Sequence, residues 1–258
     1  MINLSNIKKT AVSFFAMSAL CLAMTSQAQA TAVDVELQLL VDISGSVNNT
    51  EFNLQRTGYI NAFKSATVQT AISNGSIGSI AVQLIYWSGS YQQSVAVDWM
   101  EMNSMADALT FETTLNNAGR PYHGLTAPGS AIAFGVTEFV NNGFESNLQV
   151  MDVSGDGMRN SGTNTLAARN AALAGDIDQI NGLPIGSTSL ETWYQNNVQG
   201  GTNSFVILAS TFSDFQTAIE DKLKTEISGG NPVPEPSTMI LLGTGLIGLV
   251  GYRMKKQA

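Results

Sequence analysis

Residues 35–46 read VELQLLVDISGS, an apolar run that stops at an aspartate followed by two serines. The run is dense in Leu and Val, which is typical of a strand buried on both faces of a parallel sheet. Residues 50–66 follow it and place Phe52, Tyr59 and Phe63 on one helical face. A buried strand that leads directly into an amphipathic helix is the repeating unit of α/β proteins.

The same alternation continues through residues 31–229. We expect further strands at 77–87, 93–100, 148–153, 180–185 and 204–209, and further helices at 105–117, 130–140, 165–174 and 215–227. Ser88-Gly89-Ser90 favours a hairpin, and so an antiparallel edge strand. A capping box at residues 213–216 is expected to start the last helix. The sequence thus predicts one α/β domain with an open, Rossmann-like sheet, mostly parallel with one antiparallel edge strand and with helices on both faces.

Composition and charge fit a folded domain with an acidic surface. Hydrophobic residues make up 44% and charged residues 12% of the 258 positions, as in globular rather than disordered chains. Seven basic and twenty acidic residues give residues 31–237 a net charge of −13. Such a charge repels phosphate backbones, so we expect no nucleic-acid partner. The single cysteine, Cys21, lies outside the predicted domain, which therefore has no disulfide, cysteine-based zinc site or catalytic thiol.

The first 30 residues have the features of a secretory signal peptide. Lys8 and Lys9 precede an apolar stretch at 11–24, and Ala28-Gln29-Ala30 provides the small residues that signal peptidase requires. Leu20 lies directly before Cys21, where a lipoprotein signal needs a small residue, so a lipid anchor is not expected. We expect signal peptidase to remove residues 1–30 during export.

The C-terminal region has three parts in a fixed order. A proline-rich linker at 230–237 contains Val-Pro-Glu-Pro-Ser, an apolar run follows at 239–250, and basic residues end the chain. The apolar run is short beside the roughly 20 residues that cross a bilayer comfortably, and its basic end favours the cytoplasmic side. This arrangement resembles the PEP-CTERM sorting signal of Gram-negative bacteria. The resemblance implies processing by an exosortase and export to the cell surface or extracellular matrix, with residues 238–258 as a hydrophobic sorting or transmembrane tail that anchors the chain transiently in the inner membrane.

A first group of candidate metal ligands follows the strand at 35–43. Asp42, Ser44 and Ser46 occupy alternate positions, which point the same way in an extended chain. Their oxygens are the ligand type that hard divalent cations prefer. Capping of the next helix by Ser46 or Asn48 is the simpler interpretation of this segment taken alone.

Two further segments offer oxygen ligands at corresponding places. Thr126 precedes the helix expected at 130–140, and Asp156 follows the strand expected at 148–153. Ligands of open α/β sheets collect beyond the carboxyl ends of the strands. We therefore expect Thr126 and Asp156 to join the first group at one edge of the sheet.

Together these segments resemble the metal-ion-dependent adhesion site (MIDAS) of von Willebrand factor A-like (vWA) domains. The resemblance covers residues 33–228, and its later part is similar to a bacterial subfamily of exported domains of unknown function. It implies the metal ligands Asp42, Ser44, Ser46, Thr126 and Asp156. It also implies Mg²⁺ or Mn²⁺ as the bound ion, with Ca²⁺ as a further option.

The resemblance implies ligand recognition rather than catalysis. One coordination position of the metal stays open to an acidic group of a protein or exopolysaccharide partner, so we expect an exported binding module that is not an enzyme. A structural matrix component, in which the metal only stabilises the fold, is the alternative. A hydrolase is less favoured, because Ser44 and Ser46 lack the G-x-S-x-G pattern and the single histidine, His123, has no identifiable acid partner.

Other polar residues have simpler explanations. We expect His123 to be a solvated loop side chain. Asp152 lies inside an apolar strand, where an unpaired charge is costly, so we expect it to hydrogen-bond to the backbone or to support the metal ligands. Arg120 either pairs with an acid or is solvated. The three tryptophans are expected to pack in or around the core.

Overall fold

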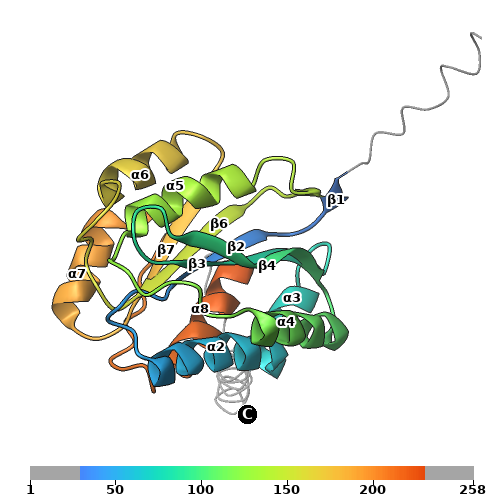
Figure 1. The fold of residues 1–258 in the computed structure, drawn as a ribbon. Coiled ribbons are helices and arrows are strands. Elements are labelled where there is room, and N and C mark those ends of the chain that lie inside the picture. Colours follow the sequence, from blue (N-terminus) through green and yellow to red (C-terminus); the bar gives the residue numbers. More distant parts are fainter. Residues whose placement is uncertain (1–29, 230–258) are drawn as a thin grey trace, which may run out of the picture. The chain divides into compact units, whose positions relative to one another are not determined.

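A computed structural model describes residues 30–229, which contain the predicted α/β domain (Figure 1). The proline-rich linker, the sorting tail and the signal peptide up to residue 29 lie outside the described residues. Within the described range, none of the helices has both the length and the apolar character needed to span a bilayer.

A six-stranded sheet in the order β4-β3-β2-β6-β7-β8 forms the centre of the domain. The inner strands are parallel, and β4 is antiparallel to β3 at one edge, as predicted. A short additional strand, β8, is antiparallel to β7 at the other edge. The strands are β2 (Glu36–Asp42), β3 (Ile80–Trp87), β4 (Gln93–Met102), β6 (Gln149–Gly155), β7 (Gln179–Pro184) and β8 (Gly200–Gly201), while β1 (Thr31–Ala32) and β5 (Phe144–Glu145) form a separate two-stranded sheet.

Helices cover both faces of the sheet, as Figure 1 shows. Four of the described helices share one hydrophobic core with the sheet, and the other three share a second core. The first group is α2 (Asn49–Lys64), α3 (Ala66–Ser73), α4 (Met105–Asn117) and α8 (Phe215–Ile227); the second is α5 (Pro128–Glu138), α6 (Thr165–Leu173) and α7 (Thr188–Asn197).

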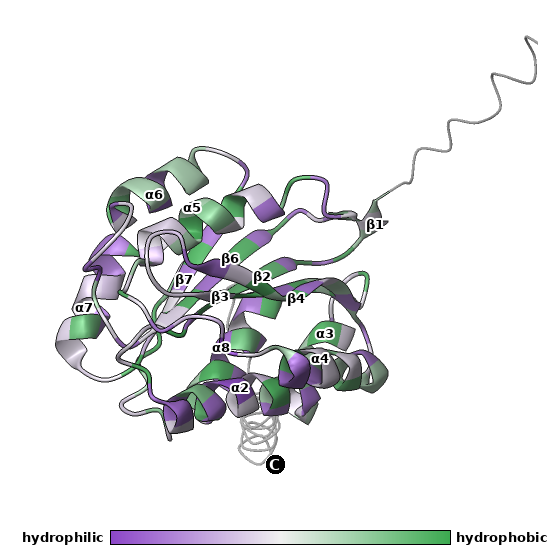
Figure 2. Ribbon diagram, viewed as in Figure 1, coloured by the Kyte–Doolittle hydropathy of each residue, from purple (hydrophilic) through white to green (hydrophobic). Residues whose placement is uncertain are grey.

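Strand β2 is buried along its whole length, between these two cores. Leu39 packs in the first core and Leu40 in the second, as the alternation of a strand requires. Figure 2 shows hydrophilic positions within the central strands as well. One of them is Gln38, whose amide nitrogen donates to Gln83 Oε1 at 2.8 Å and to the carbonyl of Gly135 at 2.9 Å. The amide nitrogen of Gln38 is therefore hydrogen-bonded within the interior, whereas its Oε1 atom is buried without a partner.

Asn48 caps helix α2, one of the two capping residues proposed from the sequence. Its side chain accepts hydrogen bonds from the backbone amides of Thr50 and Glu51, and Glu51 accepts one in return from the amide of Asn48. Because this reciprocal cap satisfies the first turn of α2, the hydroxyl of Ser46 is available for other contacts.

Some sequence-based expectations differ from the structure. Residues 204–209 form only two isolated bridges to the β7 region, not a regular strand. The predicted capping box of α8 is wrong, because the N-cap is Asp214 rather than Ser213 and no side chain makes a capping hydrogen bond; Gln216 accepts from Asn61 instead. Helices α3 and α7 were not expected, because they are short and few of their residues are buried.

Candidate metal site

The loop after β2 passes very close to the loop before α5. The amide of Gly45 donates to the carbonyl of Gly124 at 2.8 Å. A Cβ atom at position 45 would lie 3.1 Å from the carbonyl oxygen of His123, closer than side chains normally approach. Glycine at position 45 therefore allows the segment that carries Ser44 and Ser46 to reach Thr126.

The five predicted ligand residues lie together at the carboxyl end of the parallel strands. Ser46 Oγ donates to Asp156 Oδ1 at 2.7 Å, and the hydroxyl oxygens of Ser44 and Ser46 are 3.2 Å apart. Thr126 Oγ1 lies 3.5 Å from Ser44 Oγ, and the amide of Ser44 donates to Asp42 Oδ1 at 2.7 Å. A continuous series of contacts thus connects three segments that are far apart in the sequence.

These side chains differ in burial. Asp42 and Ser44 are fully buried, Thr126 is 5% exposed, Asp156 is half-buried and Ser46 is exposed. The cluster therefore has a buried floor and one side open to solvent. On this open side Asp156 borders a groove of about 510 Å³, which Asn48, Glu51 and Phe212 also line.

The electrostatics of the two carboxylates favour a bound cation. Burial raises the pKa of Asp42 to about 7, although the amide of Ser44 opposes this effect and the charge of Asp156 adds to it. Burial also raises the pKa of Asp156, whose charge is further disfavoured by Glu51. Asp42 Oδ2 is buried without a hydrogen-bond partner. A divalent cation would supply the compensation that this carboxylate lacks.

The donor set fits an oxygen-preferring metal. Nowhere in residues 30–229 do three or more His, Cys, Asp or Glu side chains form a group able to hold a metal. In the cluster described here, two carboxylates are combined with three hydroxyls, and hard cations such as Mg²⁺ accept ligands of this kind.

Arg120 fixes the shape of the ligand loop, a role that the sequence did not reveal. Its guanidinium donates to the carbonyls of Ile43, Ser44 and Val47, at 3.1 Å and 3.0 Å for the first two. It also lies 5.5 Å from the centre of the Phe52 ring. Neither predicted alternative for Arg120 describes this arrangement, since its hydrogen-bond acceptors here are mainly backbone carbonyls.

Tyr194 of α7 lies close to the buried end of the cluster, which the sequence did not reveal. A Cβ atom on Gly155 would stand 2.7 Å from Asp42 Oδ2 and 2.9 Å from the hydroxyl of Tyr194. Both atoms are buried and neither has a hydrogen-bond partner. Burial raises the pKa of Tyr194, so its hydroxyl stays protonated. The neutral phenol of Tyr194 and the unpartnered oxygen of Asp42 therefore both lie next to Gly155.

Asp152 belongs to a buried ionic cluster, not to the metal cluster or to a backbone contact. Lys222 of α8 places its ammonium 2.8 Å from Asp152 Oδ1 and also contacts Glu226. Glu226 accepts a further hydrogen bond from Asn181 on β7 at 2.9 Å. The predicted partners of Asp152, the backbone or the metal ligands, were therefore wrong. Its partner is the ammonium of Lys222, which lies 70 residues away in the sequence.

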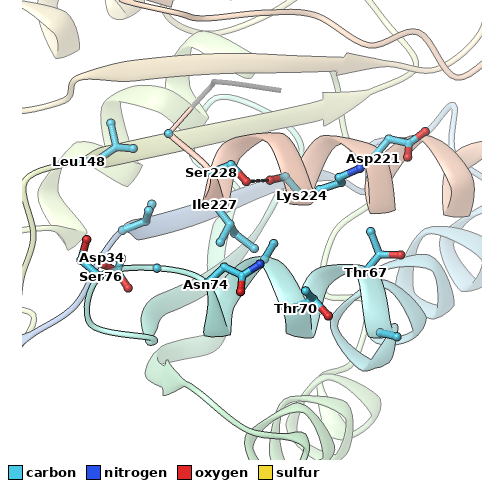
Figure 3. A pocket seen from close by; sticks show the side chains of 15 residues that line it. Asp34, Thr67, Thr70, Asn74, Ser76, Leu148, Asp221, Lys224, Ile227 and Ser228 are labelled. Atoms are coloured by element: carbon cyan, nitrogen blue, oxygen red, sulfur yellow. Dashed lines mark hydrogen bonds between the residues drawn. The ribbon is translucent and has the colours of Figure 1, made fainter. Parts of the chain in front are cut away.

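A separate cavity of about 830 Å³ lies near the start of β2, between α3 and the end of α8 (Figure 3). Asp34 lines it, but its carboxylate accepts hydrogen bonds from the amides of Ile77 and Gly78. Strand β2 begins beside this cavity and ends at Asp42, a length of roughly 20 Å. The cavity is thus distinct from the candidate metal site.

His123 lies in a solvated loop and the tryptophans pack in or around the core, as predicted. His123 is exposed in the loop before Thr126. Trp87 is fully buried in the second core. Trp99 packs against Phe139, with ring centres 5.0 Å apart, and Trp193 packs against the same core.

Residues 32–231 match the family described as "Protein of unknown function (DUF1194)". The chain belongs to this family. Residues 232–256 of this DUF1194 protein match the PEP-CTERM protein-sorting motif. The sorting motif after the α/β domain indicates an exported, surface-associated protein. A comparison with curated protein sequences gives no significant match.

Several solved structures have a fold similar to that of this chain. Proximal thread matrix protein 1 from the mussel byssus has a TM-score of 0.56 at 15% identity, over 78% of the DUF1194 chain and 48% of its own, and a second structure of that protein has a zinc-occupied MIDAS motif. The pilus adhesin SpaC from Lactobacillus rhamnosus GG also has a TM-score of 0.56 at 15% identity, over 78% and 31% of the two chains. The PilB minor pilin from Streptococcus sanguinis has a TM-score of 0.53 at 14% identity, over 79% and 64%. The chain spans about half the length of the byssus protein and about a third of that of the adhesin.

Proposed function

We propose that this protein is an exported surface or matrix module that binds an acidic group of a partner through a divalent cation. The cation would be held by Asp42, Ser44, Ser46, Thr126 and Asp156. The observation that carries the proposal is the contact between Ser46 and Asp156, which joins the loops after β2 and β6 at the carboxyl edge of the sheet.

Each part of the cluster has a distinct task in this proposal. Asp42 and Ser44 form the buried floor and Thr126 closes one side, while Ser46 and Asp156 border solvent. The bound cation supplies positive charge and an open coordination position for a partner carboxylate. Partial shielding from water strengthens that electrostatic contact.

The structural neighbours support binding rather than catalysis. One of them is a thread matrix protein with zinc in its MIDAS motif, and another is a pilus adhesin. No hydrogen bond joins His123 to Ser44 or Ser46 in the described part of the chain, so a histidine-activated serine receives no support. Mg²⁺ or Mn²⁺ is the expected ion, with Ca²⁺ and Zn²⁺ as competitors to be compared.

Thermal unfolding of the purified chain tests the metal site. Mg²⁺ or Mn²⁺ at a hundredfold excess over its dissociation constant should stabilise the fold by about 2.7 kcal/mol. Asp42→Ala should abolish that gain, whereas Asp176→Ala, which removes an exposed acid after α6, should retain it. If millimolar metal does not raise the melting temperature of the unmodified chain, the proposed function is wrong.

A structural matrix role is a second candidate, favoured by the complete burial of Asp42 and Ser44. In that case the cation would only hold the loops together. Asp42→Ala would then lower stability but leave retention at the cell surface unchanged. Comparing surface retention of the Asp42→Ala and Asp176→Ala proteins separates the two functions.

A further inference from the structure

Three loops meet beside the candidate metal site and expose large apolar side chains. Tyr91 is 95% exposed in the loop 88–92, Leu125 is 58% exposed next to Thr126, and Met158 is 45% exposed just after Asp156. We call these three side chains the apolar rim. Single exposed apolar residues are common on protein surfaces, but their collection around one site indicates an interaction surface.

The loops that carry the apolar rim are bonded to one another. The hydroxyl of Ser88 accepts from the amide of Gly124 at 2.8 Å and donates to the carbonyl of Leu125 at 3.2 Å. Asn160 accepts from the amide of Thr126 at 2.8 Å and donates its own amide to the carbonyl of Thr126 at 3.0 Å. These bonds hold the three loops in a fixed arrangement, so a partner would meet a preformed surface.

The two flanks of the metal site differ in charge. The groove beside Asp156 is lined by polar residues, among them Asn48, the half-buried Glu51 and Thr211, and also by the apolar side chains of Leu54 and Phe212. Glu51 adds a negative charge on that side, whereas Arg159 is exposed on the loop of Met158. An acidic partner is therefore repelled by the groove and attracted toward the apolar rim.

We infer that the partner is a protein that presents an Asp or Glu flanked by apolar side chains, which contact Tyr91, Leu125 and Met158. This inference rests on the proposed function and names the partner class of the same site. Aliphatic side chains such as Leu125 and Met158 gain free energy by covering apolar surface, and they offer no hydrogen bonds to a polysaccharide. Tyr, Met and Arg are also enriched at protein interfaces.

The test uses a random 12-residue peptide library displayed on phage, bound to the purified chain in Mn²⁺ and eluted with a chelator. The eluted peptides should be enriched in Asp or Glu next to Phe, Leu, Ile or Met. Leu125→Ser combined with Met158→Ser should weaken binding of these peptides at least tenfold and leave Mn²⁺ affinity unchanged.

A matched control removes exposed apolar residues at the other end of the sheet. Met105 is 45% exposed and Val140 is 68% exposed; Met105→Ser combined with Val140→Ser should leave peptide binding unchanged. An oligogalacturonate serves as the acidic polysaccharide probe and should bind more weakly than the selected peptides.

The outcomes separate this inference from the proposed function. If Mn²⁺ does not bind, both fail. If Mn²⁺ binds but the selected peptides lack apolar residues, or the apolar-rim variant binds them as well as the unmodified chain does, only the inference is overturned. Tighter binding of oligogalacturonate than of any selected peptide also overturns it.

Discussion

Ser46 donates a hydrogen bond to Asp156 across 110 residues of sequence, with 2.7 Å between the hydroxyl and the carboxylate oxygen. The two residues follow different parallel strands, β2 and β6, which are neighbours in the sheet. Strand pairing thus brings both loops to the same edge, and the hydrogen bond joins their polar groups. This contact places a carboxylate at the open side of a cluster whose other carboxylate is buried.

Gly155→Ala should damage the metal site without removing any ligand. The new Cβ would meet Asp42 Oδ2 at 2.7 Å and the Tyr194 hydroxyl at 2.9 Å, so Asp42 must move. We expect Mn²⁺ affinity to fall at least tenfold and the unfolding free energy to fall by about 1–3 kcal/mol. Calorimetric titration and urea unfolding measure the two effects. The control is Gly119→Ala, because nothing lies within 4 Å of a Cβ at position 119; equal behaviour of the two variants would contradict the prediction.

Arg120→Ala should loosen the loop that carries Ser44 and Ser46. The guanidinium holds three carbonyls of that loop, and hydrogen bonds to charged groups contribute about 1.5–3 kcal/mol each. We expect weaker Mn²⁺ binding together with a loss of stability at least as large as that of one such bond, about 1.5–3 kcal/mol. Arg120→Lys should rescue little, because an ammonium cannot reproduce the planar fork of Arg. Unchanged Mn²⁺ affinity in Arg120→Ala would show that the loop keeps its shape without this side chain.

The buried ionic cluster should make stability depend on pH. Burial raises the pKa of Glu226 to about 7, although Lys222 opposes this effect and Asp152 adds to it. The folded chain therefore retains a proton that the unfolded chain, with an ordinary glutamate pKa near 4.5, releases. The contribution of Glu226 to the unfolding free energy is fully present below about pH 4.5. It is lost as the pH rises through about 7, by an amount of the order of 3 kcal/mol.

Glu226→Gln tests this effect. The variant leaves Lys222 paired with Asp152 alone, and the Gln side chain carries no charge that burial penalises. Its unfolding free energy, measured in urea between pH 5 and pH 9, should vary less with pH than that of the unmodified chain. Asp221→Asn on the exposed side of α8 should leave the pH dependence as it is. A steep dependence that persists in Glu226→Gln would assign the effect to other groups.

The sequence predicted much of the fold because the hydrophobic patterns of several helices and of strand β2 match the burial of these segments in the structure. The helices at 105–117 and 215–227 were predicted with the bounds that the structure has, and β2 is buried on both faces as its composition indicated. Residues 204–209 have the composition of a strand but make only isolated bridges. Helix α7 was missed because only Leu190 and Tyr194 are buried in it, too few to create a recognisable period.

The candidate site was predictable only in part, for a related reason. Asp42, Ser44 and Ser46 lie close in the sequence, and strand-end positions suggested Thr126 and Asp156. Arg120 and Tyr194 reach the site from a loop and a helix that carry no local signal of that role. Their positions depend on tertiary packing, which brings the Arg120 guanidinium to the loop carbonyls and the Tyr194 phenol close to Gly155.

Anomalous X-ray scattering from a Mn²⁺-soaked crystal of the purified chain is the most direct test of the five-residue metal site. A single strong peak should lie among the hydroxyls of Ser44, Ser46 and Thr126, next to Asp156, and it should disappear in a crystal of Asp42→Ala. Saturating Mn²⁺ that gives no peak there, or gives peaks only elsewhere on the surface, would contradict the metal site and the binding function derived from it.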